Sequence, residues 1–219
     1  MTNNSLIISI NELLKNKNFD YAFCGGYAID LFLGQLTRRH GDVDVFAYWE
    51  DRDAVIKYMW SHGFEVYEMI GGGQAHKITD VNNQMKLKRN IIAVDNCEFV
   101  SLNHTDNINI FDVDFLPVQQ SKPNFIEFLF NDKTDTDFLY ARDHRVKLNL
   151  EKAVLYRNDI PYLAPEICLL YKSTDTERKG YQQDYDNAVK CMSAEQIMWL
   201  NEALKFVYPD GHKWIQRSV

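Results

Sequence analysis

The segment Gly41-Asp42-Val43-Asp44-Val45 alternates charged and apolar residues, which is the pattern of a β-strand with one buried face. Residues two apart on a strand point to the same side and lie about 6.5–7 Å apart along the backbone. Asp42 and Asp44 therefore share a face, and their carboxylates can converge on two cations held about 3.5–4 Å apart. Magnesium prefers such hard oxygen ligands. Taken alone, however, an Asp-x-Asp pair is more typical of a solvated strand face.

A glycine pair precedes this strand. The run Tyr21-Ala22-Phe23-Cys24 predicts a short buried strand that leads into Gly25-Gly26. Residues 27–33 then predict a helix that ends at Gly34. A strand that turns into a helix presents backbone N–H groups and the positive end of the helix dipole, which suits a polyphosphate. An isolated Gly-Gly pair is also typical of a plain tight turn.

A second pair of carboxylates lies in the alternating segment from Asn109 to Pro117, which predicts another strand. Asp112 and Asp114 share one face of that strand. Either could be a third metal ligand, or the base that takes a proton from an attacking hydroxyl. The residues alone leave the choice between them open.

Two ordered runs carry these motifs. The first is Gly25-Gly26-Tyr27-Ala28-Ile29-Asp30, then Gly34, then Thr37-Arg38-Arg39-His40-Gly41-Asp42-Val43-Asp44-Val45. The second is Ile160-Pro161-Tyr162-Leu163-Ala164-Pro165-Glu166, then Leu169-Leu170-Tyr171-Lys172. Together they resemble the signature of antibiotic nucleotidyltransferases. The closest likeness is to the aminoglycoside 2''-adenylyltransferase and lincosamide nucleotidyltransferase group, within the wider polymerase-β-like superfamily.

The resemblance implies a reaction in which a substrate hydroxyl attacks the α-phosphorus of a metal-bound nucleoside triphosphate and pyrophosphate leaves. It implies Mg2+, with two ions expected, and ATP or another nucleoside triphosphate as co-substrate. The implied metal ligands are Asp42, Asp44 and Asp114. Asp114 is preferred over Asp112 as the catalytic third carboxylate because Pro117 follows it at a family-like interval. Nucleotide contacts are implied for Gly25, Gly26, Arg38 and Lys172.

Other acidic residues have plainer interpretations. Asp30, one turn inside the predicted helix, is expected to bond the Thr37-Arg38 loop. Asp184 and Asp186 lie on a later predicted helix and are expected to form a solvated face. The chain has Gly180-Tyr181 where the family more usually has a Lys-Asp pair, which weakens any catalytic interpretation of these two acids.

The composition is that of a folded acidic protein. Hydrophobic residues make up 46% of the chain, enough to build a core, and the net charge is −7. The acidic balance argues against a nucleic-acid partner and suits a cationic acceptor. No apolar run reaches about 18 residues, and the first residues lack the blocks of a secretory signal, so we expect a cytoplasmic protein without membrane association. The cysteines have no metal-site spacing and are expected to be buried, reduced thiols: Cys24, Cys97, Cys168 and Cys191.

The succession of patterns predicts an α+β fold. From Gly71 to Pro117 the chain predicts strands, including one over residues 84–89. Beyond Pro123 it predicts mainly helices, including one over residues 125–130. We therefore expect a polymerase-β-like mixed-sheet nucleotidyltransferase domain over residues 1–120 and a mainly helical, acceptor-binding domain over residues 121–219.

The leading hypothesis is metal-dependent transfer of a nucleoside monophosphate, AMP from ATP, to a hydroxyl of a small molecule. An aminoglycoside or lincosamide antibiotic is the expected acceptor, so antibiotic resistance is the expected biological role. Two alternatives stay open: a nucleotidyltransferase that modifies a protein partner, of the toxin–antitoxin type, and a non-catalytic nucleotide-binding module. The acceptor, the preferred nucleotide and the oligomeric state leave no readable motif.

Overall fold

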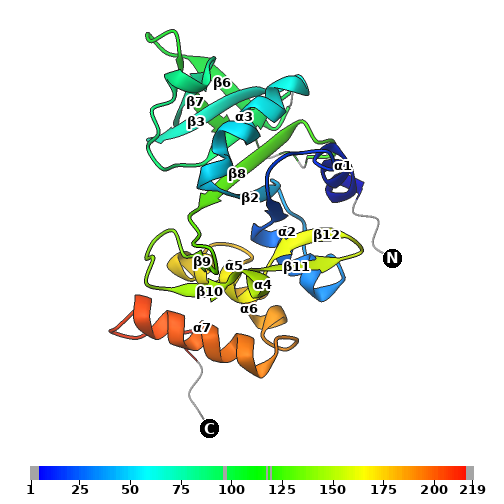
Figure 1. Ribbon diagram of the computed structural model, residues 1–219, viewed down its shortest axis with the longest axis vertical. Helices are drawn as coiled ribbons and strands as arrows, with labels where there is room; N and C mark the ends of the chain where they lie inside the picture. The colour runs from blue at the N-terminus through cyan, green and yellow to red at the C-terminus, as the bar shows by residue number, and fades with distance from the viewer. Residues whose placement is uncertain (1–4, 96–97, 117, 119, 216–219) are drawn as a thin grey trace. The chain divides into compact units, whose positions relative to one another are not determined.

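The computed structural model describes residues 5–95, 98–116, 118 and 120–215, which form two compact units (Figure 1). The sheet unit comprises the described part of residues 3–21 and 40–131. The helical unit comprises residues 22–39 and the described part of 132–219. This division differs from a single boundary near residue 120, because residues 22–39 fold with the helical unit and residues 121–131 with the sheet unit.

A mixed sheet forms the centre of the sheet unit, with the strand order β2-β8-β5-β3-β4-β7-β6. The strands of this unit are β2 (Asp44–Tyr48), β3 (Glu65–Gly71), β4 (Gln74–Ile78), β5 (Ile91–Val94), β6 (Val100–His104), β7 (Ile110–Phe115) and β8 (Phe125–Asn131). β2 and β8 run parallel, whereas the neighbours from β8 to β6 are antiparallel. Two parallel strands cannot be joined by a hairpin and need a long connection. Here the connection between β2 and β8 contains most of the other elements of the unit.

Two helices complete the sheet unit. They are α1 (Ser5–Leu13) and α3 (Arg52–Ser61), with the short 3-10 turns η1 (Trp49–Asp51) and η2 (Val81–Asn83). The apolar face of α1 is buried through Leu6, Ile7 and Ile10. The Tyr58 hydroxyl donates to the carbonyl oxygen of Leu13 at 2.7 Å, which ties α3 to the end of α1.

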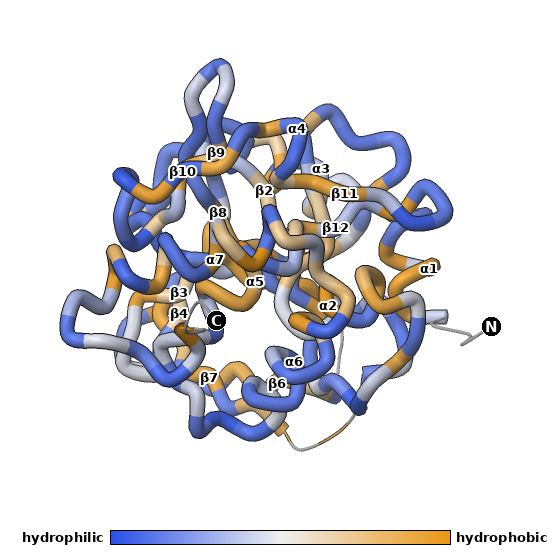
Figure 2. The backbone as a smooth tube through the Cα atoms, turned by 90° about the horizontal axis from the view of Figure 1, so that it is seen from below, coloured by the Kyte–Doolittle hydropathy of each residue, from blue (hydrophilic) through white to orange (hydrophobic). Residues whose placement is uncertain are grey.

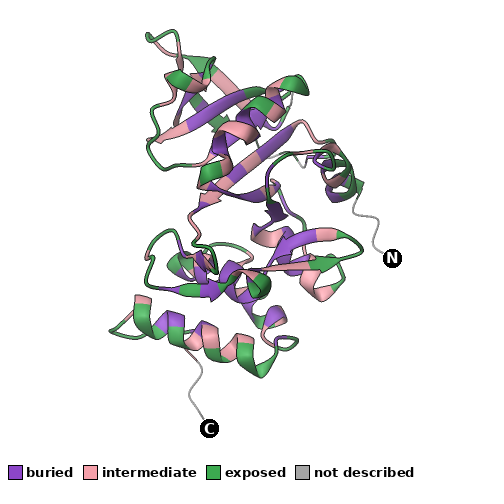
Figure 3. Cartoon of the chain, viewed as in Figure 1, coloured by how far each residue is buried: buried purple, intermediate pink, exposed green. Residues whose placement is uncertain are grey.

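Two predicted elements of this unit are wrong. The predicted helix over residues 125–130 is strand β8, which pairs with β2 on one side and β5 on the other. A short continuous apolar run is compatible with either a buried strand or a buried helix, so periodicity could not distinguish them. In Figure 3, β8 combines buried and intermediate residues. The predicted strand over residues 84–89 is a loop between η2 and β5.

A buried charged network lies between α3, β3 and β4. Glu68 is 1% exposed and accepts from the Arg52 guanidinium at 3.0 Å and from Nδ1 of His76 at 3.1 Å. It also accepts from the backbone N–H groups of Met85 and Lys86. Arg52 in turn donates to the Gln84 side chain at 2.7 Å. The Arg52–Glu68 ion pair therefore holds the loop 84–90 against α3 and β3.

Removing this buried carboxylate is expected to destabilise the sheet unit. Glu68→Gln leaves the Arg52 charge buried without its partner, which costs about 3–5 kcal/mol in comparable sites. The matched control is Glu65→Gln on the same strand, because Glu65 pairs with Lys77 at the surface and such pairs contribute about 0.2–1 kcal/mol. Urea unfolding of both variants measures the difference. Equal losses would contradict a structural role for the Arg52–Glu68 pair.

The helical unit combines a small group of strands with helices. Its strands are β1 (Tyr21–Phe23), which begins at the unit boundary, β9 (Asp137–Leu139), β10 (Lys147–Asn149), β11 (Val154–Arg157) and β12 (Ile160–Leu163). Its helices are α2 (Gly25–Leu33), α4 (Leu150–Ala153), α5 (Pro165–Lys172), α6 (Tyr181–Ala188) and α7 (Ala194–Val207), with the 3-10 turn η3 (Ser173–Asp175). Figure 2 shows hydrophobic residues gathered along strands and helices and hydrophilic residues in the outer loops.

Short local motifs shape this unit. The hairpin β11–β12 turns at Asn158 and Asp159, which have the positive φ angles (50° and 63°) that these residue types tolerate best. Ser193 and Gln196 form a capping box at the start of α7. Cys24 and Cys168 are buried as expected, but Cys191 is exposed because it lies beyond the end of α6. Cys97 lies outside the described residues.

No helix among the described residues is long and apolar enough to cross a membrane.

Glu166 is a buried acid in the first turn of α5. It is 3% exposed and accepts from Nε2 of Gln196 at 2.8 Å. Burial raises the pKa of its carboxyl from 4.5 to about 7, because the charged form loses hydration. The folded state therefore holds a proton that the unfolded state releases between pH 4.5 and pH 7.

This raised pKa makes stability depend on pH. The contribution of Glu166 is fully present below pH 4.5 and is lost as the pH rises through about 7. Glu166→Gln, which keeps the shape and an acceptor for Gln196, should stabilise the protein at pH 8 by up to about 3 kcal/mol and give no gain at pH 4.5. Thermal melts of both proteins across this range test it. A gain independent of pH would contradict the assignment.

Candidate functional site

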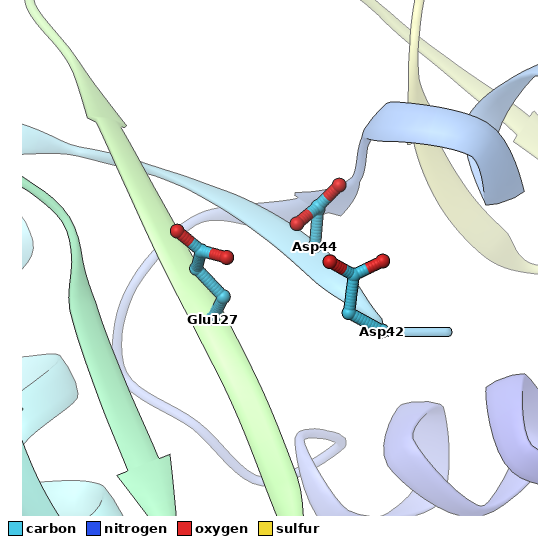
Figure 4. Close-up of side chains that lie close together, drawn as sticks. All are labelled: Asp42, Asp44 and Glu127. Carbon is cyan, nitrogen blue, oxygen red and sulfur yellow. The ribbon is translucent and has the colours of Figure 1, made fainter. Parts of the chain in front are cut away.

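Three carboxylates come together in the sheet unit. They belong to Asp42, Asp44 and Glu127, and each contributes one carboxylate oxygen that lies within 4.8 Å of the oxygens from the other two. Figure 4 shows the three side chains on the same side of β2 and β8, with their carboxylates turned toward one another. All three are partly exposed. The structure thus brings together the two aspartates predicted from their spacing and adds a glutamate from another strand.

The parallel pairing of β2 with β8 places these groups. Asp44 is the register partner of Glu127, so their side chains leave the sheet side by side on one face. The Glu127 N–H donates to the carbonyl oxygen of Val43 at 3.2 Å, which extends the pairing to the residue between the two aspartates. Asp42, two residues before Asp44, stands just ahead of β2. The apolar residues that alternate with the carboxylates, Val43 and Val45, are fully buried and hold the strand in this register.

This donor set fits a hard divalent cation. Three carboxylates at such short range repel one another, and a bound cation relieves the repulsion. Oxygen ligands from two or three acids are what Mg2+ usually takes from a protein, with water or substrate phosphate completing its coordination. Among the described residues, Asp42, Asp44 and Glu127 form the one group of three acids, histidines or cysteines close enough to hold a metal ion.

Asp112 and Asp114 do not join this cluster. They lie on β7, which is separated from β2 by β8, β5, β3 and β4. Five strand spacings correspond to about 24 Å, far beyond the reach of an aspartate side chain. Both residues are exposed, and they accept from Gln74 at 2.9 Å and from Asn103 at 3.1 Å. Pro117, which favoured Asp114 from the sequence, lies outside the described residues. Glu127 takes the position in the cluster that was expected for Asp114.

Glu127 was missed because its segment was predicted to be a helix. A single acid in the run Phe-Ile-Glu-Phe-Leu-Phe is the signal that could have found it, since a strand buried on both faces rarely carries an isolated charge. Nothing in the local sequence pairs residue 127 with residue 44. That pairing follows from the parallel register of two strands far apart in the chain.

The predicted nucleotide-binding residues all lie in the helical unit. Gly25 and Gly26 form the first turn of α2, with Cys24 as the N-cap. Gly25 has a φ of 64°, a conformation that glycine adopts without strain. The first N–H groups of an α-helix have no partner within the helix, so this turn presents donors of the kind that bind phosphate.

Arg38 and Lys172 converge on Asp184, which is fully buried. Arg38 donates through Nε and Nη2 to the two carboxylate oxygens, both at 2.9 Å, and the Lys172 ammonium lies 3.1 Å from one of them. The solvated face predicted for Asp184 is therefore wrong, whereas Asp186 is exposed as expected. Two cationic side chains thus share one carboxylate.

Gly180 and Tyr181 fit around these cations. Gly180 has a φ of +90°, and a Cβ there would lie 2.7 Å from Nε of Arg38. The ring of Tyr181 lies 4.2 Å from the Lys172 ammonium, in cation–π range. Gly180 therefore leaves space for the Arg38 side chain, and Tyr181 covers the Lys172 ammonium. These two residues stand where the family more usually has a Lys-Asp pair. The predicted role of Asp30 is confirmed as well, since it accepts from the backbone and hydroxyl of Thr37 at 2.9 and 2.6 Å.

Comparison with solved structures identifies the fold as that of the antibiotic nucleotidyltransferases. The crystal structure of ANT(2'')-Ia in complex with adenylyl-2''-tobramycin is 15% identical, with a TM-score of 0.56 over 95% of this chain and 99% of that one. The crystal structure of the lincosamide antibiotic adenylyltransferase LnuA, lincomycin-bound, is 14% identical, with a TM-score of 0.52 over 86% and 98%. The solution structure of ANT(2'')-Ia is 13% identical, with a TM-score of 0.51 over 94% and 92%. The predicted α+β class is confirmed.

The family match agrees with the fold. Residues 6–78 match the family model of the aminoglycoside-2''-adenylyltransferases. The match includes the glycine pair, Arg38, Asp42 and Asp44, and it ends before Glu127. No curated protein matches the sequence significantly. The resemblance to the aminoglycoside and lincosamide group is thereby confirmed, and the proteins that define it are adenylyltransferase enzymes.

A metal bound by Asp42, Asp44 and Glu127 should stabilise the folded protein. A cation at 100 times its dissociation constant adds about 2.7 kcal/mol, so Mn2+ or Mg2+ should raise the melting temperature. Asp44→Asn and Glu127→Gln should reduce this rise at a given metal concentration, because each weakens metal binding, and should melt at or above the wild-type temperature without metal because a repelling charge is gone. The matched control is Asp114→Asn, which should keep the full rise. A rise lost in Asp114→Asn and kept in Glu127→Gln would refute the assignment.

Proposed function

We propose that this protein transfers a nucleoside monophosphate, AMP from ATP, to a hydroxyl group of a small molecule, with Mg2+ as the metal. The observation that carries the proposal is the cluster of Asp42, Asp44 and Glu127 on the parallel strands β2 and β8. A fold shared with ANT(2'')-Ia and LnuA supports it. The two aspartates lie within the matched family segment, which supports it further.

Asp42, Asp44 and Glu127 are the proposed metal ligands, with two ions expected. The bound metal would neutralise charge that builds up on the phosphoryl oxygens during transfer. Glu127 replaces Asp114 and Asp112 in the role of third carboxylate and proposed base. In this role its carboxylate takes the proton of the acceptor hydroxyl. The hydroxyl oxygen would then form a bond to the α-phosphorus. The bond between the α-phosphorus and the oxygen that bridges it to the β-phosphorus would break, and pyrophosphate would leave.

The phosphate chain is the proposed ligand of Gly25, Gly26, Arg38 and Lys172. The first turn of α2 offers backbone donors to phosphate oxygens. Arg38 and Lys172 bring two positively charged side chains to the same carboxylate, and such side chains are the usual protein ligands of phosphate. Asp184 also keeps the Arg38 fork in a single orientation through its two-point contact, which preorganises the guanidinium.

An antibiotic of the aminoglycoside or lincosamide type is the proposed acceptor. ANT(2'')-Ia is described with adenylyl-2''-tobramycin and LnuA with lincomycin, and both have the fold of this chain. The net charge of −7 favours a cationic acceptor such as an aminoglycoside by long-range attraction. Modification of such a drug would give the protein a role in antibiotic resistance.

The test is incubation of the protein with Mg2+, each nucleoside triphosphate and a panel of aminoglycosides and lincosamides. Mass spectrometry should find an acceptor heavier by one nucleotide and an equal amount of pyrophosphate. Asp44→Asn and Glu127→Gln should lower the rate at least about 100-fold, whereas Asp112→Asn, an exposed acid on the same sheet, should leave it within about twofold. Transfer of labelled nucleotide only to a protein in a lysate would contradict the small-molecule acceptor. Absence of transfer to any acceptor would contradict the reaction itself.

A further inference from the structure

Asn90 contacts the third carboxylate of the metal cluster. Its side-chain nitrogen Nδ2 donates to Oε1 of Glu127. An ionised carboxylate only accepts hydrogen bonds, so the amide presents its NH2 group there and its oxygen elsewhere. The donor is neutral, and it therefore orients Glu127 without adding a charge to a site that already holds three acids.

The backbone of Asn90 is hydrogen-bonded to the edge of strand β3. Its carbonyl oxygen accepts from the N–H of Met69 on β3 at 3.0 Å. The next residue, Ile91, opens β5 and is the register partner of both Glu68 and Phe128. The backbone of Asn90 is therefore held in place one residue before β5, the strand that pairs with β8. From this position its side chain can contact Glu127 on β8.

The loop that leads to Asn90 is held by buried charges. Arg52 donates through Nη1 to the carbonyl oxygen of Arg89 at 3.0 Å, while the Glu68 carboxylate accepts the N–H groups of Met85 and Lys86. Arg52 and Glu68 are 3% and 1% exposed. These bonds secure the loop at its first residues and at the residue before Asn90.

The loop conformation itself is strained. Lys86 and Lys88 have φ angles of 52° and 51°, in the left-handed region that long side chains rarely adopt, and each such residue costs about 1–3 kcal/mol. Met85 and Leu87 are exposed, so apolar burial does not offset this cost. The bonds from Arg52 and Glu68 help to maintain the strained path, and the Lys88 ammonium lies 5.9 Å from the centre of the Trp49 ring. A strained loop that ends beside a cluster of acids is typical of a segment kept for its function.

We propose that Asn90 is a positioning residue for Glu127, and that the buried Arg52–Glu68 pair holds the loop 84–90 so that it performs this role. The inference rests on the proposed function, in which Glu127 is a metal ligand. Partners that orient a metal-ligating side chain typically change metal affinity or activity about 10–100-fold when they are removed. Asn90 would then affect the metal centre through its hydrogen bond to Glu127, without being a metal ligand itself.

The experiment is calorimetric titration of the nucleotide-free protein with Mn2+ alone. Asn90→Ala should weaken Mn2+ binding about 10–100-fold. The matched control is Asn103→Ala, because Asn103 makes the same amide–carboxylate contact with Asp114 at 3.1 Å on β6 and β7, away from the cluster. This control should bind Mn2+ like the wild type. Melting curves without metal should show both variants folded, and Asn90→Leu, of similar volume, is measured in its place if the alanine variant does not fold.

A double-mutant cycle separates positioning from a general structural effect. In a Glu127→Gln background the Asn90 substitution should change Mn2+ affinity less than twofold, since the group that it orients is already altered. Equal Mn2+ affinity of the wild type and a folded Asn90 variant would overturn this inference and leave the proposed function standing. An undiminished effect of the substitution in the Glu127→Gln background would also overturn it. Failure of the wild type to bind Mn2+ at all would overturn both.

Discussion

The parallel pairing of β2 with β8 is the constraint on which the candidate site depends. Parallel neighbours require a long connection, and here that connection contains α3 and the strands that extend the sheet. The pairing places Asp44 opposite Glu127, residues that are 83 positions apart in the sequence. A slip of one residue would turn Glu127 to the other face of the sheet. The buried Val45 and Phe128, register partners on the opposite face, oppose such a slip because it would expose them.

Each unit of the protein contains a buried acid that holds one or two cationic side chains in place. In the sheet unit Glu68 holds Arg52 and the loop that ends at Asn90. In the helical unit Asp184 holds Arg38 and Lys172. Buried ion pairs add little net stability compared with apolar packing, but loss of one partner is costly. Their value here lies in fixing the direction of side chains and loops that the proposed reaction uses.

The sequence predicted the parts of the site that are local. Asp42 and Asp44 follow from strand alternation, and the Asp30 contact follows from its position in the helix. Glu127 and Asp184 could not be predicted in the same way. The first depends on a pairing between distant strands, and the second on a contact between α6 and a loop 146 residues away. The error over residues 125–130 had a definite cause, because a short, mostly apolar run with a single acid is too brief to show whether its period is that of a helix or of a strand.

We propose that Asp42, Asp44 and Glu127 form the metal centre of a nucleotidyltransferase. A crystal structure with Mn2+ and a non-hydrolysable ATP analogue, in which anomalous scattering locates the metal, tests this proposal. We expect Mn2+ bonded to oxygens of all three acids and to phosphate oxygens of the analogue. Mn2+ bonded to Asp112 or Asp114, or a bound nucleotide with no Mn2+ at the three acids, would contradict it.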